Sequence, residues 1–213
     1  MIIDKEYSKK LALDLLNINA VVLRPDRPFV WSSGWRSPIY CDNRLTLNYP
    51  EIRKSIAHHF TEFIKKNYPE VDVLTGTATA GIPHAAWVAD RLDLPMAYVR
   101  NKTKSYGMGN QIEGGVKRGQ STLIIEDLIS TGTSVISVAN VIEFISAEVN
   151  GILSIFTYGF DQAHAKIKEA GYNLYTLTDY PTLINVAVEN NYIDENQLQT
   201  LNEWRQKPDT WPK

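Results

Sequence analysis

The chain has 213 residues, 44% of them apolar, which is enough for one domain with a buried core or one domain with an attached subdomain. Its 22 Lys and Arg against 24 Asp and Glu give a formal net charge of −2, which argues against a surface that grips nucleic acid or anionic lipid as a whole. A local anion site remains compatible with that balance. Cys41 is the single cysteine, so an intrachain disulfide and a Cys-based zinc cluster are excluded, and we expect a reducing, cytoplasmic location.

Neither a membrane span nor a signal peptide is expected. The least charged stretches, such as residues 128–142, are shorter than the roughly 18 residues that a span needs, and they carry Ser, Thr and Asn. Near the N-terminus, Asp14 interrupts the apolar stretch, and Asp4, Lys9 and Lys10 fall on a helical pattern. We therefore expect no membrane partner.

The first segment predicts an amphipathic helix over residues 4–19. Its apolar residues recur at spacings of three and four, at Tyr7, Leu11, Leu15 and Ile18. Short extended pieces are predicted at 21–24 and 29–31, with a Pro-Asp-Arg-Pro turn between them.

A second helix is predicted from a capping-box pattern, in which Asn48 is followed three residues later by Glu51. Its apolar face is formed by Ile52, Ile56, Phe60 and Phe63. Tyr68 and Pro69 are expected to end it.

From residue 71 onward, short apolar runs alternate with helical patterns. The runs are 71–75, 96–100, 122–125, 152–158 and 174–178, and the helical patterns are 82–92, 132–147 and 161–170. Such alternation predicts β-α-β units and an α/β fold with a central, mostly parallel sheet flanked by helices. The last 30 or so residues indicate two helices and a Trp/Pro-rich tail. We expect a ligand-binding core of residues 46–185 and a small hood subdomain formed by 1–45 with 186–213.

The most informative segment is Thr122-Leu-Ile-Ile-Glu126-Asp127-Leu-Ile-Ser130-Thr131-Gly132-Thr133-Ser134. A buried strand is predicted to deliver two carboxylates at its C-terminal end, where open α/β sheets bind ligands. The hydroxyl-rich loop that follows opens a helix, whose free N–H groups and positive dipole end suit a phosphate. Paired acids beside a phosphate cradle fit a phosphorylated sugar.

The alternative interpretation makes these hydroxyls ordinary helix caps and the acids a solvated turn. A cap needs one hydroxyl, whereas this segment has four within five residues. The glycine patterns of nucleoside-triphosphatases and dinucleotide-binding folds do not occur after the predicted strands. We therefore favour the sugar-phosphate site.

This segment resembles the signature of the type I phosphoribosyltransferases, which bind phosphoribosyl pyrophosphate (PRPP). Two further stretches, 29–42 (Phe-Val-Trp-Ser-Ser-Gly-Trp-Arg-Ser-Pro-Ile-Tyr-Cys-Asp) and 100–114 (Arg-Asn-Lys-Thr-Lys-Ser-Tyr-Gly-Met-Gly-Asn-Gln-Ile-Glu-Gly), narrow the resemblance to the branch of the family that uses orotate. The resemblance implies the family's core with a hood, and transfer of phosphoribosyl from PRPP to orotate. The products would be orotidine 5-phosphate and pyrophosphate, in de novo pyrimidine (UMP) biosynthesis.

The resemblance also implies roles for the residues of the main segment. Glu126 and Asp127 would hold the ribose 2- and 3-hydroxyls, Asp127 as a catalytic residue, and Ser130 would also contact the orotate ring. The PRPP site would be lined by Glu126, Asp127, Leu128, Ile129, Ser130, Thr131, Gly132, Thr133 and Ser134. Residues 75–83 match the family's pyrophosphate loop, although they also form an ordinary β-α turn.

A basic loop precedes the main segment. Arg100, Lys102 and Lys104 alternate, which in an extended chain places all three on one side, and glycines flank them. A solvated run of charges is the alternative. Residues 100–118 hold five basic residues and one acidic residue, a local charge of +4, so the remaining residues together carry −6.

By resemblance, this 100–118 loop would close over the site of the neighbouring subunit of a homodimer. Arg100, the catalytic Lys104 and Tyr106 would bind PRPP, Arg100 and Lys104 at its pyrophosphate. Tyr106 stands where many family members have His; its phenol donates a hydrogen bond but carries no positive charge at pH 7. Mg²⁺ would be bound mainly through PRPP oxygens and waters.

At the positions that bind orotate in the family, this sequence differs from many members. Ser32 stands in place of a Lys that contacts both substrates in some members, and residues 158–161 lack the Arg that many use for the orotate carboxylate. Arg36 or backbone N–H groups would take that role instead. Tyr40 would stack on the base, although a core position is the alternative.

No metal site formed by protein side chains is expected, because the adjacent His58 and His59 point about 100° apart on a helix. Two other functions stay open: a phosphoribosyltransferase for another nucleobase, and a non-catalytic PRPP-sensing regulator of the same fold. A regulator that binds nucleic acid would need a basic stripe or a helix-turn-helix, and we identify neither, so no nucleic-acid partner is expected.

Overall fold

The computed structural model describes residues 1–31, 34–100 and 111–211. Its helices are α1 (Lys5–Asn17), the 3₁₀ helix η1 (Asn43–Asn48), α2 (Pro50–Asn67), α3 (Gly81–Leu92), α4 (Thr133–Phe144), α5 (Asp161–Glu169), α6 (Tyr180–Glu189) and α7 (Glu195–Gln206). Its strands are β1 (Val21–Leu23), β2 (Phe29–Val30), β3 (Arg36–Ser37), β4 (Ile39–Cys41), β5 (Val73–Thr77), β6 (Met96–Val99), β7 (Ile112–Glu113), β8 (Ser121–Ile129), β9 (Glu148–Thr157) and β10 (Leu174–Asp179).

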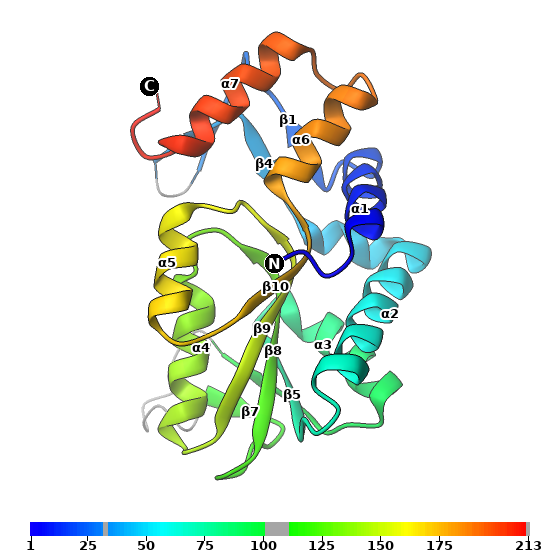
Figure 1. The fold of residues 1–213 in the computed structure, drawn as a ribbon, viewed down its shortest axis with the longest axis vertical. Coiled ribbons are helices and arrows are strands. Elements are labelled where there is room, and N and C mark those ends of the chain that lie inside the picture. Colours follow the sequence, from blue (N-terminus) through cyan, green and yellow to red (C-terminus); the bar gives the residue numbers. More distant parts are fainter. Residues whose placement is uncertain (32–33, 101–110, 212–213) are drawn as a thin grey trace.

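The central sheet has the strand order β10-β9-β8-β5-β6-β7. All neighbouring pairs are parallel except β6 with β7, which run antiparallel. Helices α4 and α5 cover one face, and α2 and α3 cover the other (Figure 1). Because both faces are covered, the strands are nearly continuous apolar runs, and the prediction of an α/β fold with a mostly parallel sheet is confirmed.

The direction of chain winding reverses between β5 and β8. From β5 the chain crosses to β6 on one side, whereas from β8 it crosses through β9 to β10 on the other. At such a switch point the loops leaving the carboxyl ends of two adjacent strands separate and open a crevice. The main sequence segment lies on this crevice, because it includes most of β8 and the loop that follows it.

Helix α1 confirms the predicted N-terminal helix. The carboxylate of Asp4 accepts hydrogen bonds from the N–H groups of Glu6 and Tyr7, both at 2.9 Å, which fixes the start. Tyr7, Leu11 and Leu15 are buried, as the spacing predicts.

The predicted capping box at Asn48 and Glu51 is wrong. Asn48 is the last residue of η1, and α2 begins at Pro50, with Tyr49 at the cap position and no side-chain cap hydrogen bond. Proline at the first helical position has no N–H to satisfy and has a φ already suited to a helix, so α2 starts without a polar cap. Its end at Tyr68 is as predicted.

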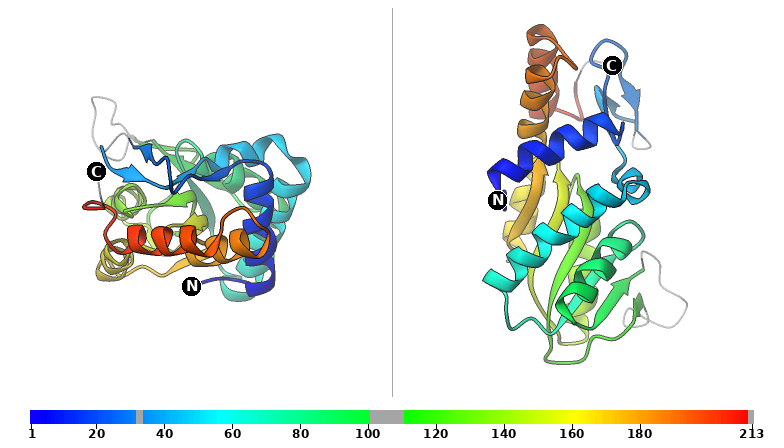
Figure 2. Two further views of the ribbon diagram at one scale, coloured as in Figure 1. Left: turned by 90° about the horizontal axis from the view of Figure 1, so that it is seen from above. Right: turned by 90° about the vertical axis from the view of Figure 1, so that its right-hand side faces the viewer.

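Segments from both halves of the chain meet at one end of the molecule, where the Tyr192 hydroxyl donates to Oδ1 of Asn17. Helices α1, α6 and α7 and the short ladders β1-β4 and β2-β3 occupy one end of the molecule (Figures 1 and 2). The first residues also reach the core sheet, because Ile2 forms a parallel bridge with Thr176 of β10. The division into a 46–185 core and a hood stays a prediction.

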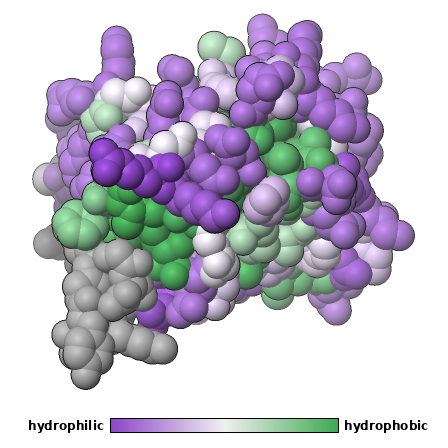
Figure 3. Space-filling model, turned by 90° about the horizontal axis from the view of Figure 1, so that it is seen from below, coloured by the Kyte–Doolittle hydropathy of each residue, from purple (hydrophilic) through white to green (hydrophobic). Residues whose placement is uncertain are grey.

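Seen from the end opposite α6 and α7, apolar side chains reach the surface in areas separated by polar ones (Figure 3). Within the described residues, none of the helices is both long and apolar enough to cross a membrane.

Candidate active site

The acid pair lies inside strand β8 rather than after its end. The strand continues to Ile129 because it pairs with β9 as far as the Ile129–Thr157 match, whereas its pairing with β5 stops at Ile125. From Glu126 onward, one edge of β8 is therefore free of a neighbouring strand. This free edge opens the crevice beside the two carboxylates.

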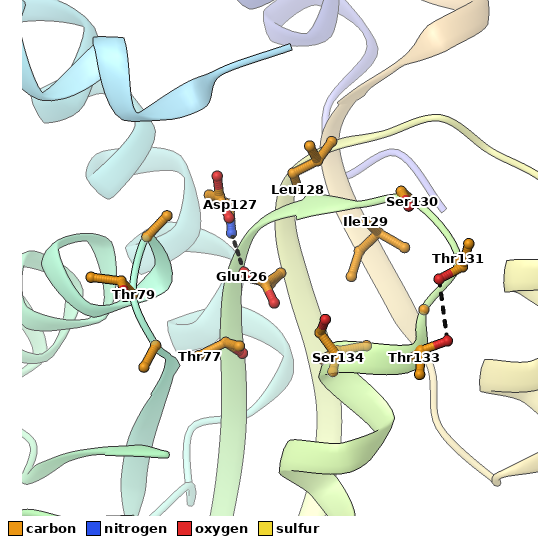
Figure 4. A pocket seen from close by; sticks show the side chains of 14 residues that line it. Thr77, Thr79, Glu126, Asp127, Leu128, Ile129, Ser130, Thr131, Thr133 and Ser134 are labelled. Atoms are coloured by element: carbon orange, nitrogen blue, oxygen red, sulfur yellow. Dashed lines mark hydrogen bonds between the residues drawn. The ribbon is translucent and has the colours of Figure 1, made fainter. Parts of the chain in front are cut away.

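The two acids differ in burial. Glu126 is only 5% exposed, whereas Asp127 is half-buried. The backbone N–H of Asp127 donates to Oε1 of Glu126 at 3.0 Å (Figure 4). Burial, and then the neighbouring charge of Asp127, raise the pKa of Glu126 well above its ordinary value. Burial also raises the pKa of Asp127. The pair therefore holds a proton more tightly than two solvated carboxylates do.

The hydroxyl-rich loop leads directly into α4. Gly132 occupies the cap position with φ +76°, and no side chain caps the helix. Thr131 and Thr133 share a hydrogen bond at 3.2 Å, while Thr133 and Ser134 are exposed (Figure 4). Because the hydroxyls do not cap α4, the capping interpretation does not account for them. The loop presents hydroxyls and first-turn N–H groups to the crevice, as a phosphate requires.

A first cavity of about 280 Å³, here the acid-pair cavity, fills the crevice. One wall is residues 77–80, the end of β5 and the loop after it, and the other runs from Glu126 to Val135 (Figure 4). It brings together every predicted PRPP-binding residue from Glu126 to Ser134. Gly81 lets α3 approach this site, because a Cβ there would overlap the carbonyl oxygen of Ile125.

A second cavity of about 590 Å³, here the aromatic cavity, adjoins the first. The two share Leu128, Ser130 and Thr131. Its remaining lining comes mainly from residues 30–41 and consists of Val30, Trp31, Trp35, Tyr40, Cys41 and Tyr158. This lining suits a planar ring placed next to a ligand in the acid-pair cavity.

Two of the three predicted orotate contacts lie in the same cavity, and the third lies outside it. Ser130 and Tyr40 both line the aromatic cavity, and Tyr40 is 43% exposed, so the alternative of a core tyrosine is wrong. Arg36 is exposed on β3 and does not line this cavity. Its carbonyl oxygen instead accepts a hydrogen bond from the indole of Trp204.

The basic loop is described only at its two ends. Arg100 follows β6, and its guanidinium lies 3.1 Å from the carboxylate of Glu113 on β7. Gln111 closes the base of the loop, donating its side-chain amide to the Arg100 carbonyl at 2.9 Å. Lys102, Lys104 and Tyr106 lie outside the described residues, as does Ser32.

One residue of the site was missed by the sequence reasoning. Asn43, fully buried in η1, donates its side-chain amide to the backbone carbonyl of Asp127 at 2.7 Å. Its Oδ1 lies 3.4 Å from Sγ of Cys41, which acts as a donor. Asn43 therefore ties η1 to the acid pair. The only sequence signal was its position directly after the 29–42 motif.

Comparisons with known proteins agree with this geometry. The family model of the phosphoribosyl transferase domain matches residues 47–179, well over half of the chain. Orotate phosphoribosyltransferase of Listeria innocua is 54% identical over 205 residues, covering 96% of this chain and 98% of that protein.

Solved structures agree as well. Orotate phosphoribosyltransferase from Aeropyrum pernix is 27% identical, with a TM-score of 0.74, over 86% of this chain and 99% of that one. Leishmania donovani UMP synthase is 26% identical, with a TM-score of 0.79; 93% of this chain matches 42% of that longer chain.

The chain belongs to the phosphoribosyltransferase family, a family of pentosyltransferase enzymes. Within that family, it is a member of the orotate phosphoribosyltransferases.

Proposed function

We propose that this chain transfers the phosphoribosyl group of PRPP to orotate, giving orotidine 5-phosphate and pyrophosphate in de novo pyrimidine biosynthesis in the cytoplasm. The observation that carries the proposal is the pair of adjoining cavities. One offers paired acids and a phosphate cradle, and the other offers an aromatic lining for a base. Because they meet at Leu128, Ser130 and Thr131, a base in one cavity would face a sugar in the other.

The acid pair binds the sugar in this proposal. Glu126 and Asp127 hold the ribose 2- and 3-hydroxyls, and Ser130 to Ser134 bind the 5-phosphate. As carboxylates, both acids accept hydrogen bonds from adjacent hydroxyls, and burial raises the pKa of each. The sugar is thereby fixed with its anomeric carbon turned toward the base, which lowers the entropic cost of the reaction.

Magnesium fits the oxygen donors of this cavity. Both carboxylates line it, and hard cations of this kind take oxygen ligands, commonly one or two carboxylates with substrate phosphates and waters. In the described part of the chain, no group of three or more His, Cys, Asp or Glu forms a cage for a metal. PRPP oxygens and waters would mainly hold the ion beside the acid pair. When bound, it neutralises charge on the departing pyrophosphate.

The basic loop binds the leaving group. As pyrophosphate departs, charge builds on its oxygens, and Arg100 and Lys104 stabilise that charge. Arg100 exchanges its contact with Glu113 for pyrophosphate. Closure of the 100–118 loop over the site of the neighbouring subunit in a homodimer keeps water from the activated sugar.

Loss of orotate absorbance tests the reaction. Purified protein is incubated with PRPP, Mg²⁺ and orotate, with parallel samples containing uracil or a purine base. We expect turnover with orotate. Turnover with another base but not with orotate would change the assigned substrate and leave the assignment as a phosphoribosyltransferase in place. No turnover with any base, together with a strong, salt-sensitive shift of DNA or RNA, would favour the regulator instead.

Two variants test the shared site. Lys104→Ala is expected to lower kcat by orders of magnitude with little loss of stability, and Asp127→Asn to inactivate the chain. Mixed together, they should regain activity, because each hybrid dimer has one site with both residues intact. With subunit exchange verified, a mixture that stays inactive would mean that one chain builds the whole site.

A further inference from the structure

The aromatic cavity lacks a partner for a carboxylate. Among its described lining residues none is charged, while orotate carries a carboxylate on its ring. Transferring a carboxylate from water into such a lining without a cation is costly. A cation or N–H donors close to the cavity would offset this cost, an argument that rests on the function proposed above.

A third cavity of about 330 Å³, here the Arg205 cavity, adjoins the aromatic one. They share Trp35 and Thr131. Arg205, from the last turn of α7, lines it, and it is the one Lys or Arg among the described lining residues of the three cavities. Asp161, at the start of α5, lines the same cavity, but it forms no ion pair with Arg205.

The Arg205 side chain is partly buried and held in place. Its Nη2 donates to the carbonyl of Gly159 at 2.9 Å, whereas its buried Nε has no hydrogen-bond partner. Gly159 has φ +64°, and a Cβ there would lie 3.4 Å from Nη2. The guanidinium thus packs against the residue directly after Tyr158, which lines the aromatic cavity. It retains donors for an anion beside that wall.

We propose that Arg205 binds the carboxylate of orotate and so selects carboxylated pyrimidines over uracil. The ring occupies the aromatic cavity, and its carboxylate points across Trp35 and Thr131 toward the guanidinium. Arg205 replaces the arginine that residues 158–161 lack. The alternative, Arg36, is exposed and lines none of the three cavities.

Paired ligands that differ only in the carboxylate test this assignment. Calorimetry measures binding of orotidine 5-phosphate and of UMP, and kinetics gives kcat/KM for orotate and for uracil. Arg205→Gln should weaken orotidine 5-phosphate binding and orotate kcat/KM roughly 10- to 100-fold, the range for a hydrogen bond to a charged group. UMP binding and uracil turnover should stay within about twofold. Lys207→Gln, the same charge change two residues away, is the matched control.

Arg205→Lys keeps the proposal testable if the Gln variant unfolds. Lysine keeps the charge but lacks the planar fork, so an intermediate loss of orotidine 5-phosphate binding is expected. Equal weakening of both ligands would mean a structural role and would overturn the assignment, as would a selective loss in Arg36→Gln alone. Wild-type protein that binds neither nucleotide and turns over no base overturns the proposed function itself.

Discussion

Replacing Trp204 by alanine tests whether α7 is an integral part of the molecule. The indole is fully buried, and its Nε1–H donates to the carbonyl of Arg36 at 3.0 Å. Aromatic rings surround it with centroid distances of 5.5 to 5.9 Å, from Trp31, Tyr158, Phe160 and Tyr180. The side chain therefore joins α7 to β3 and to the wall of the aromatic cavity.

The expected cost of Trp204→Ala follows from these contacts. Truncating a buried tryptophan lowers the free energy of unfolding by about 3–5 kcal/mol. For a chain of this size each kcal/mol lowers Tm by roughly 2–4 °C, so we expect a fall of roughly 6–20 °C. Trp204→Phe keeps most ring contacts and leaves the Arg36 carbonyl without this donor, which costs about 1–3 kcal/mol.

Unfolding in guanidinium chloride, followed by circular dichroism at 222 nm, measures the loss of unfolding free energy in both Trp204 variants without depending on tryptophan fluorescence. Phe144→Ala serves as the control, because that aromatic residue is 61% exposed at the end of α4 and its loss should cost about 0.5 kcal/mol or less. A Trp204→Ala loss below about 1 kcal/mol would refute the reasoning, since α7 would then be dispensable for the fold.

Three further predictions concern the acid pair. Glu126→Gln should be more stable than wild type at high pH, because the folded wild type binds the Glu126 carboxyl proton more tightly than the unfolded chain and loses stability when that proton leaves. The difference in free energy of unfolding should be absent below the ordinary pKa of 4.5 and should grow as pH rises toward the raised pKa of the folded state. Thermal melting of both proteins from pH 4 to 9 checks this difference in stability, and a wild type more stable than Glu126→Gln at pH 8 would contradict the prediction. The variant should also bind PRPP more weakly. Asn43→Ala should lower the free energy of unfolding by about 1–3 kcal/mol by removing the donor to the Asp127 carbonyl, and raise KM for PRPP; an unchanged KM would mean that the bond does not position the acid. Gly81→Ala should cost about 1–3 kcal/mol in a denaturant titration, because its Cβ meets the β8 backbone, whereas Gly115→Ala, with open space around it, should be nearly neutral; equal effects would reject the close packing.

The local elements were predictable because their signals are short-range. The helix capped by Asp4 and the alternating strands and helices after residue 71 follow from apolar spacing, which acts within a few turns. The capping box at Asn48 failed because Pro50 determined the start of α2. Strand β8 ran past the predicted end because its pairing with β9, a distant segment, continued to Ile129.

The sequence by itself determined the lining chemistry of the acid-pair cavity, because the two acids and the hydroxyl loop lie within one stretch of 13 residues. Only the tertiary structure decided what surrounds that stretch. Asn43 lies 84 residues from Asp127, and Arg205 lies 46 residues from Gly159. No periodicity in the chain relates residues so far apart; the packing of η1 and α7 against the loops of the central sheet brings them together. The polar lining of the acid-pair cavity from Glu126 to Ser134 was therefore predictable, whereas most of the aromatic cavity's lining, apart from Tyr40 and Ser130, was not.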